Sequence, residues 1–86
     1  MKVYEVSFGA DGFKFLDEIH LTLKGANERI RELPDFLNNS ISDISILKIA
    51  ETKVYGDENK VYKFICECKD NTRKVVLWIN EKELEP

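Results

Sequence analysis

With 86 residues, 43% of them hydrophobic and 34% charged, the chain has the composition of a folded globular protein and the length of one domain, residues 1–86. Its 13 basic and 16 acidic residues are spread along the whole sequence and give a net charge of −3, which disfavours a polyanionic partner such as DNA. The start of the chain is too interrupted by charge for a signal peptide, and no apolar run approaches membrane-spanning length, so we expect a cytoplasmic protein without membrane association.

The N-terminal region predicts a β-hairpin. A first strand runs from about Lys2 to Phe8, and the segment from Gly9 to Gly12 has the glycines and aspartate of a turn. The return strand lies within Phe13 to Lys24. Its second half alternates, so we expect one face to join the core and the other to face solvent. The expected core face holds Ile19, Leu21 and Leu23, and the solvent face holds Glu18, His20, Thr22 and Lys24.

A change of period after Gly25 predicts one helix. Asn27 suits the N-cap, and one apolar stripe is formed by Ile30, Leu33 and Leu37. Because an internal proline removes a hydrogen bond, Pro34 predicts a kink or a restart as Pro34–Asn39. The triplet Asn38-Asn39-Ser40 ends the helix. It also fits the N-glycosylation pattern, but without a secretory signal we interpret it as loop chemistry.

The C-terminal half predicts a three-stranded meander. Its strands and turns are Ile44–Tyr55, the turn Gly56–Asn59, Lys60–Lys69, the turn Asp70-Asn71, and Arg73–Glu81. Together with the N-terminal hairpin, this order predicts an α+β fold: a mainly antiparallel sheet of about five strands in the order ββαβββ, with one short helix packed on one face.

The last hairpin also predicts which residues face each other. A two-residue turn at Asp70-Asn71 gives a core face on which Cys66 pairs with Val75, Phe64 with Leu77, and Tyr62 with Ile79. The opposite face pairs Glu67 with Lys74, Ile65 with Val76, and Lys63 with Trp78, as a charge pair, an apolar pair and a cation–π contact.

This second face is the candidate partner surface, made of Val61, Lys63, Ile65, Val76 and Trp78. A single helix cannot cover both faces of a sheet, so an apolar strip that contains a tryptophan requires an explanation. Two explanations stay open. Either the strip contacts a partner or a second copy, or the segment carrying Phe13, Phe15 and Leu16 folds over it as a covering loop.

Few residues of the sequence are suited to catalysis or to binding a cofactor. His20 is the only histidine and has no serine or cysteine in a local nucleophile signature. Cys66 and Cys68 lie on the core side of one strand, so we expect free thiols that pack as small hydrophobic groups. A zinc site needs more ligands than these two thiols and His20 supply. Gly9 and Gly12 flank a hairpin turn, where no phosphate-binding loop forms. We therefore expect no catalytic residues, no cofactor and no metal.

The remaining hypothesis is binding. We expect a non-enzymatic protein-binding module that acts by occupying a surface through the apolar sheet face or a sheet edge, with acidic residues at the rim steering a basic partner. A concrete form is a small phage or mobile-element inhibitor of a host protein. One alternative is a homodimeric accessory or structural subunit. Another is a single-stranded nucleic-acid binder that uses Trp78 and the basic residues Lys53, Lys60, Lys63, Arg73 and Lys74, although acidic residues interleave them.

Overall fold

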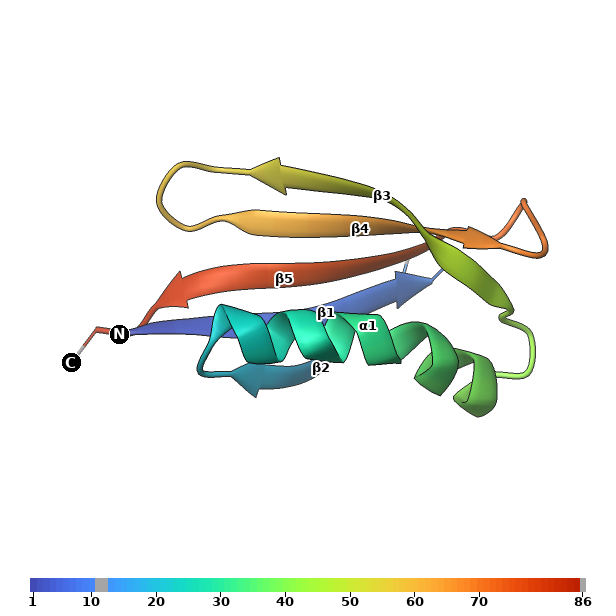
Figure 1. Ribbon diagram of the computed structural model, residues 1–86, viewed down its shortest axis with the longest axis horizontal. Coiled ribbons are helices and arrows are strands. Elements are labelled where there is room, and N and C mark those ends of the chain that lie inside the picture. Colours follow the sequence, from blue (N-terminus) through green and yellow to red (C-terminus); the bar gives the residue numbers. More distant parts are fainter. Residues whose placement is uncertain (11–12, 86) are drawn as a thin grey trace.

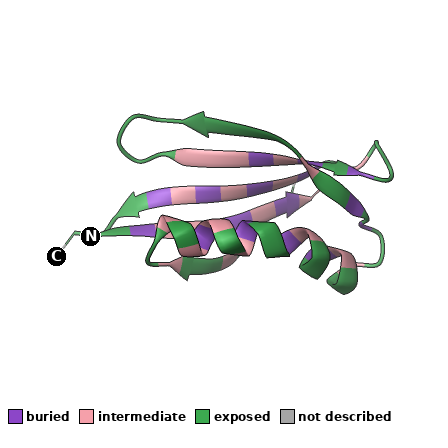
Figure 2. Cartoon of the chain, in the orientation of Figure 1, coloured by how far each residue is buried: buried purple, intermediate pink, exposed green. Residues whose placement is uncertain are grey.

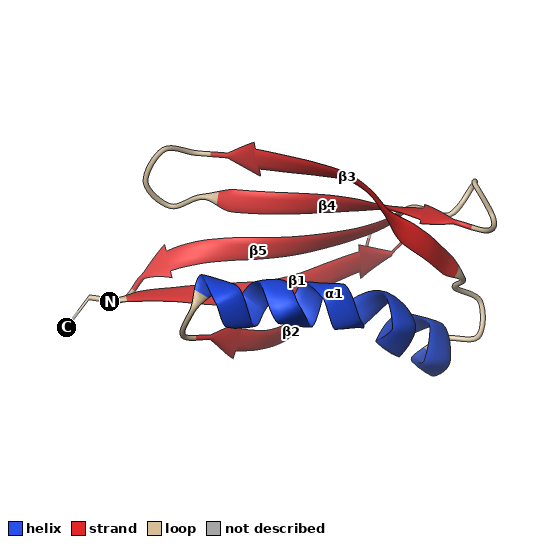
Figure 3. Cartoon of the chain, in the orientation of Figure 1, coloured by secondary structure: helices blue, strands red, loops and turns tan. Residues whose placement is uncertain are grey.

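A computed structural model describes residues 1–10 and 13–85 of the chain. It contains five strands and one helix in the predicted order ββαβββ (Figures 1 and 3). The elements are β1 (Lys2–Ala10), β2 (Phe13–His20), α1 (Leu23–Ser40), β3 (Ile46–Tyr55), β4 (Val61–Cys68) and β5 (Val75–Glu83). The α+β fold class is confirmed, and at 18 residues the helix is longer than the short helix that was expected.

All five strands form one antiparallel sheet in the order β2-β1-β5-β4-β3. The first and last strands pair along their whole length, from Lys2 opposite Glu83 to Ala10 opposite Val75. This pairing joins the N-terminal hairpin to the C-terminal meander. It also brings the two ends of the described chain together, where the amino group of Met1 lies 2.8 Å from a carboxylate oxygen of Glu83.

The helix packs on one face of the sheet (Figure 1). Its N-cap is Thr22, whose Oγ1 accepts a hydrogen bond from the backbone N–H of Gly25 at 3.0 Å, so the prediction of Asn27 as the N-cap was wrong. The predicted stripe is confirmed and begins one turn earlier: the buried helical residues are Ala26, Ile30, Leu33 and Leu37. The helix continues through Pro34 without the predicted restart, because this stripe is buried on both sides of the proline.

The second strand differs from the prediction in its end and in its faces. It ends at His20, because residues 21–24 form the N-cap region and the start of α1. A β-bulge in its pairing with β1, between Val6 and Ser7, shifts the alternation by one residue. His20 consequently turns toward the helix, whereas Ile19, expected in the core, is 56% exposed. The predicted first turn extends over residues 11 and 12, which lie outside the described residues.

The meander follows the prediction in the register of β4 and β5, but the predicted Glu67–Lys74 charge pair is wrong, because Glu67 pairs with Lys48 at 3.8 Å. Cys66 lies opposite Val75, with the pairs Phe64–Leu77, Tyr62–Ile79, Ile65–Val76 and Lys63–Trp78 in the predicted register. The connection is closed by a turn in which the N–H of Arg73 donates to the carbonyl of Asp70 at 3.0 Å. At the other turn, Gly56 adopts a φ of +87°, a left-handed conformation that favours glycine.

The core lies between α1 and the sheet. The largest fully buried side chains are Ile30, Leu33, Leu37, Leu77, Ile79, Val6 and Val75. The tip of the β3–β4 hairpin lies beyond the helix and is exposed (Figure 2). Asn38 ties the end of the helix to the start of β3: its amide donates to the carbonyl of Ile46 at 2.9 Å and accepts from the N–H of Ile46 at 2.6 Å. This asparagine of the glycosylation-like triplet therefore has a structural role.

Candidate functional site

The five residues of the candidate partner surface lie together on the face of the sheet opposite α1, here called the open face. The pairing of β4 with β5 sets Ile65 opposite Val76 and Lys63 opposite Trp78, with Val61 one step further along the same face. All five side chains are half-buried. The structure thus brings together the residues that the sequence assigned to one surface, and whether that surface binds a partner stays a prediction.

Trp78 lies on the backbone of the neighbouring strand β1. A Cβ atom placed on Gly9 would lie 2.8 Å from Cζ3 and 2.9 Å from Cη2 of the indole, so only glycine leaves room for the ring in this position. The ammonium of Lys14, on β2, lies 5.0 Å from the centre of the indole. The predicted cation–π partner, Lys63, is the cross-strand neighbour of Trp78 but does not make the contact; Lys14 does.

The segment that was considered as a covering loop is strand β2. Its side chains divide between the two faces, so it does not fold over the apolar strip. Phe15 lies on the helix side, where its ring stacks on Phe8 with centroids 5.3 Å apart. Phe13 pairs with Ala10 at the start of β2 and also lines the hollow beside Trp78, and Leu16, on the open face opposite Ser7, is 60% exposed. Of this segment, Lys14 makes the contact with Trp78.

The open face is basic. Among the described residues it carries three more lysines than glutamates, whereas the whole chain has a net charge of −3. The lysines are Lys14, Lys48, Lys53, Lys63, Lys74 and Lys82, and the glutamates are Glu5, Glu51 and Glu67. The expectation of an acidic rim that steers a basic partner was wrong, because alternation along the strands places lysines around the apolar strip.

Two shallow hollows lie side by side on this face. One, of about 260 Å³, is lined by Lys63, Ile65, Cys66, Arg73, Lys74, Val75 and Val76. The other, of about 160 Å³, is lined by Gly9, Phe13, Lys14, Lys74, Val76 and Trp78. Lys74 and Val76 line both hollows, so the hollows form one apolar depression with lysines at its rim. Most of its exposed lining is carbon, as expected for a surface that receives apolar side chains.

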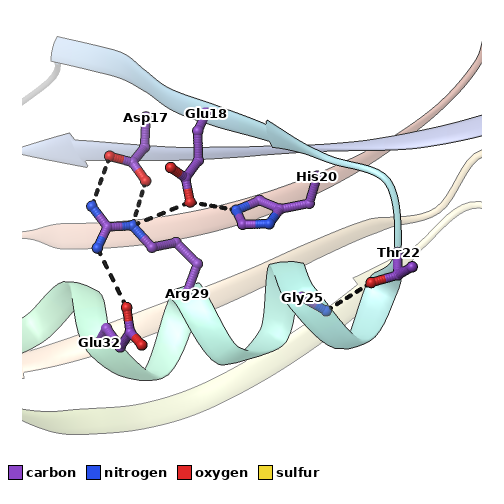
Figure 4. Close-up of polar contacts among 7 residues, drawn as sticks. All are labelled: Asp17, Glu18, His20, Thr22, Gly25, Arg29 and Glu32. Carbon is purple, nitrogen blue, oxygen red and sulfur yellow. Dashed lines mark hydrogen bonds and ion pairs between the residues drawn. The ribbon is translucent and has the colours of Figure 1, made fainter.

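A cluster of polar side chains lies on the helix side of the sheet, between β2 and α1 (Figure 4). Nε and Nη2 of Arg29 donate to the two carboxylate oxygens of Asp17 at 2.7 and 3.1 Å. Arg29 also pairs with Glu18 and Glu32, and His20 contacts Glu18. Hydrogen bonding to Asp17 raises the pKa of the Arg29 guanidinium above its ordinary value. These contacts fix the helix against the edge of the sheet, and His20, predicted on the outer face, takes part in them.

The two cysteines are thiols buried on the helix side, as predicted. Burial raises the pKa of the Cys66 thiol to about 12, and the neighbouring Cys68 adds to the shift. Because the thiolate is the reactive form, Cys66 is unsuited to act as a nucleophile at neutral pH. In the part of the chain that the structure describes, no three or more of the residues His, Cys, Asp and Glu are arranged to hold a metal ion.

Comparison with protein-family models, with curated proteins and with solved structures found no match to this chain. Within residues 1–10 and 13–85, no helix has both the length and the apolar character needed to cross a bilayer.

Sequence reasoning missed Gly9 and Lys14 as parts of the candidate site. Both come from the N-terminal hairpin, and they reach Trp78 only because β1 pairs with β5. No local pattern signals that long-range pairing. The weak signal that was present is a glycine near the end of a strand, which often marks the close approach of another group.

Proposed function

We propose that this protein is a non-enzymatic module that binds another protein with the open face of its sheet. The observation that carries this proposal is an uncovered apolar strip. In the described part of the chain the helix lies on one face, while Val76, Trp78 and their neighbours occupy the other without a covering element. The open face of an antiparallel sheet is usually polar, and an apolar strip rimmed by charge is typical of an interaction surface.

The charge on the open face favours a different protein over a second copy of this chain. A symmetric dimer formed through this face would bring the same patch of both copies together, so Lys14, Lys63 and Lys74 of one copy would approach those of the other. Like charges in an interface oppose association. The homodimeric alternative therefore has less support from this surface.

Pairing through the β3 edge of the sheet is also less favoured. The outer edge of β3 has no neighbouring strand in the sheet order, but its pairing with β4 is interrupted by two register shifts. It also carries Lys48 and Lys53. Bulges and lysines are the features by which natural proteins protect exposed edges against strand addition. The face of the sheet, and not its edge, is the surface that we propose.

Such a module needs no chemistry of its own, because it acts by occupying a surface. An inhibitor that blocks the working surface of its target is one form of this mechanism, and it is the form that we favour for a chain of this size. Two buried thiols agree with a reducing compartment, from which we infer a cytoplasmic location.

The double variant Val76→Ser/Trp78→Ala tests this proposal. Both side chains lie outside the buried core, so we expect the variant to keep its circular dichroism spectrum and to lose a partner captured by the wild type from cells that carry the gene. Val54→Ser is the matched control. It makes the same valine substitution at a residue of β3 that is 53% exposed and lies on the helix side. Unfolding of the double variant, or equal capture by both variants, would contradict the proposal.

A further inference from the structure

The glutamates of the open face are all paired with lysines of the same face. The pairs are Glu5 with Lys82 at 3.0 Å, Glu51 with Lys53 at 3.5 Å, and Glu67 with Lys48 at 3.8 Å. Three lysines of this face remain, Lys14, Lys63 and Lys74, and the described residues supply none of them with a carboxylate partner. The surplus of lysines over glutamates on this face therefore consists of these three side chains.

These three lysines surround the apolar depression. Lys63 lines the hollow beside Ile65, Lys14 lines the hollow beside Trp78, and Lys74 stands between the two. Lys63 is in β4, Lys14 is in β2, and Lys74 directly precedes β5. Strand pairing, and not proximity in the sequence, therefore places them together. The result is an apolar depression whose lining includes three lysines.

We propose that the open face binds an acidic segment of its protein partner, with an apolar side chain seated beside Ile65 and Val76 and flanking carboxylates paired with the three lysines. This inference rests on the proposed function and adds the chemistry of the partner. Carboxylate–ammonium contacts at the rim of an apolar contact are charge-assisted hydrogen bonds that also accelerate encounter. The apolar contact provides affinity, and the lysines provide specificity for an acidic partner.

A single-stranded nucleic acid would also meet three lysines beside a tryptophan, but a base that stacks on the indole competes with Lys14 for the ring. The Cζ3–Cη2 edge of the Trp78 ring lies against Gly9, and the Lys14 ammonium lies over the ring. A base that stacked on Trp78 would have to displace Lys14 and lose the cation–π contact. The aromatic pair Phe8 and Phe15 lies on the opposite side of the sheet. Nucleic-acid binding by sheet proteins relies on such stacking, so the acidic protein segment is the better match.

Selection of peptides from a random 12-residue display library tests two claims: that the open face binds a protein, and that the bound segment is acidic. The immobilised baits are the wild type, the Val76→Ser/Trp78→Ala variant and the charge-reversed variant Lys63→Glu/Lys74→Glu. Lys24→Glu is the matched control, because Lys24 is an exposed lysine on α1, away from the open face. Selected peptides are then synthesised and titrated by fluorescence anisotropy at low and high salt, beside a labelled 12-nucleotide oligothymidine.

We expect wild type to select peptides with Asp or Glu flanking an apolar residue. Their affinity should fall at least tenfold in Lys63→Glu/Lys74→Glu, fall with added salt, and remain unchanged in Lys24→Glu. Selection of basic or neutral peptides that require Val76 and Trp78 would overturn the acidic partner but leave the binding face intact. No selection above the Val76→Ser/Trp78→Ala bait would overturn both proposals. Tight oligothymidine binding that is lost on charge reversal, without peptide selection, would replace the protein partner with a nucleic acid.

Discussion

Gly9→Ala should displace Trp78 from its position on β1. The new methyl carbon would lie 2.8 and 2.9 Å from two indole carbons and 3.0 Å from the carbonyl oxygen of Phe13. Carbon atoms in contact prefer separations of about 3.5–4.0 Å, so the ring has to move by roughly 1 Å. Overpacking of this kind costs about 1–3 kcal/mol, and replacement of a strand glycine by alanine recovers about 0.5–1 kcal/mol. We therefore expect a net loss of about 1–2 kcal/mol in the free energy of unfolding.

Urea denaturation followed by circular dichroism measures this loss, and the emission maximum of Trp78, the only tryptophan, should shift to the red as the ring leaves the sheet. A double-mutant cycle with Trp78→Leu assigns the cause. Once the indole is removed, Gly9→Ala should cost about 1 kcal/mol less than in the wild type, because the shortest contacts are gone. An equal cost in both backgrounds, or a stabilised single variant with unchanged emission, would refute the position that we assign to Trp78.

Three further predictions concern the rest of the fold. Asn38→Ala should lower the free energy of unfolding by about 2–4 kcal/mol, because both buried backbone groups of Ile46 lose their partner, whereas the exposed neighbour Asn39→Ala should change it by less than about 0.5 kcal/mol in the same urea titration. The pKa of Glu81 is lowered. Burial alone would raise it, but hydrogen bonds from the Lys60 N–H and the Tyr62 hydroxyl and the charge of Lys2 outweigh burial. Its stabilising effect is therefore complete above the unfolded pKa and is lost on acidification, so between about pH 5 and pH 2 the stability of Glu81→Gln should fall less steeply than that of the wild type. The Cys66 thiol, with a pKa of about 12, should not react with a disulfide reagent at pH 8 until denaturant is added, and rapid labelling of the native protein would contradict its burial.

The C-terminal meander could be predicted from the sequence because its signals are local. Polar turn residues separate three alternating segments, and the register expected from a turn near Asp70 gives every pair from Cys66–Val75 to Tyr62–Ile79, although the connection is longer than the predicted two-residue turn. The same alternation assigns Val76 and Trp78 to the face away from the core. Three of the four apolar residues of the buried helical stripe were also recognised from their spacing.

The region from β2 to the start of α1 could not be predicted in the same way. One bulge opposite Val6 and Ser7 reverses the faces of the rest of β2, and alternation alone does not reveal a bulge. Leu23 fits both a continuing strand and the first turn of the helical stripe. The hydrogen bond from Gly25 to Thr22 decides in favour of the helix. Lys14 was missed as a neighbour of Trp78 because its position depends on the long-range pairing of β1 with β5.

The central claim is that the open face is uncovered and basic around Trp78, and fluorescence quenching tests it most directly. The two quenchers are iodide, an anion, and caesium, a cation, compared at equal ionic strength. Because Lys14, Lys63 and Lys74 surround the indole, iodide should quench Trp78 more strongly than caesium, and Lys63→Glu/Lys74→Glu should reduce or reverse the difference. Quenching by neither ion would mean that the face is covered, and stronger quenching by caesium would mean that its charge is not positive; either result would contradict the account.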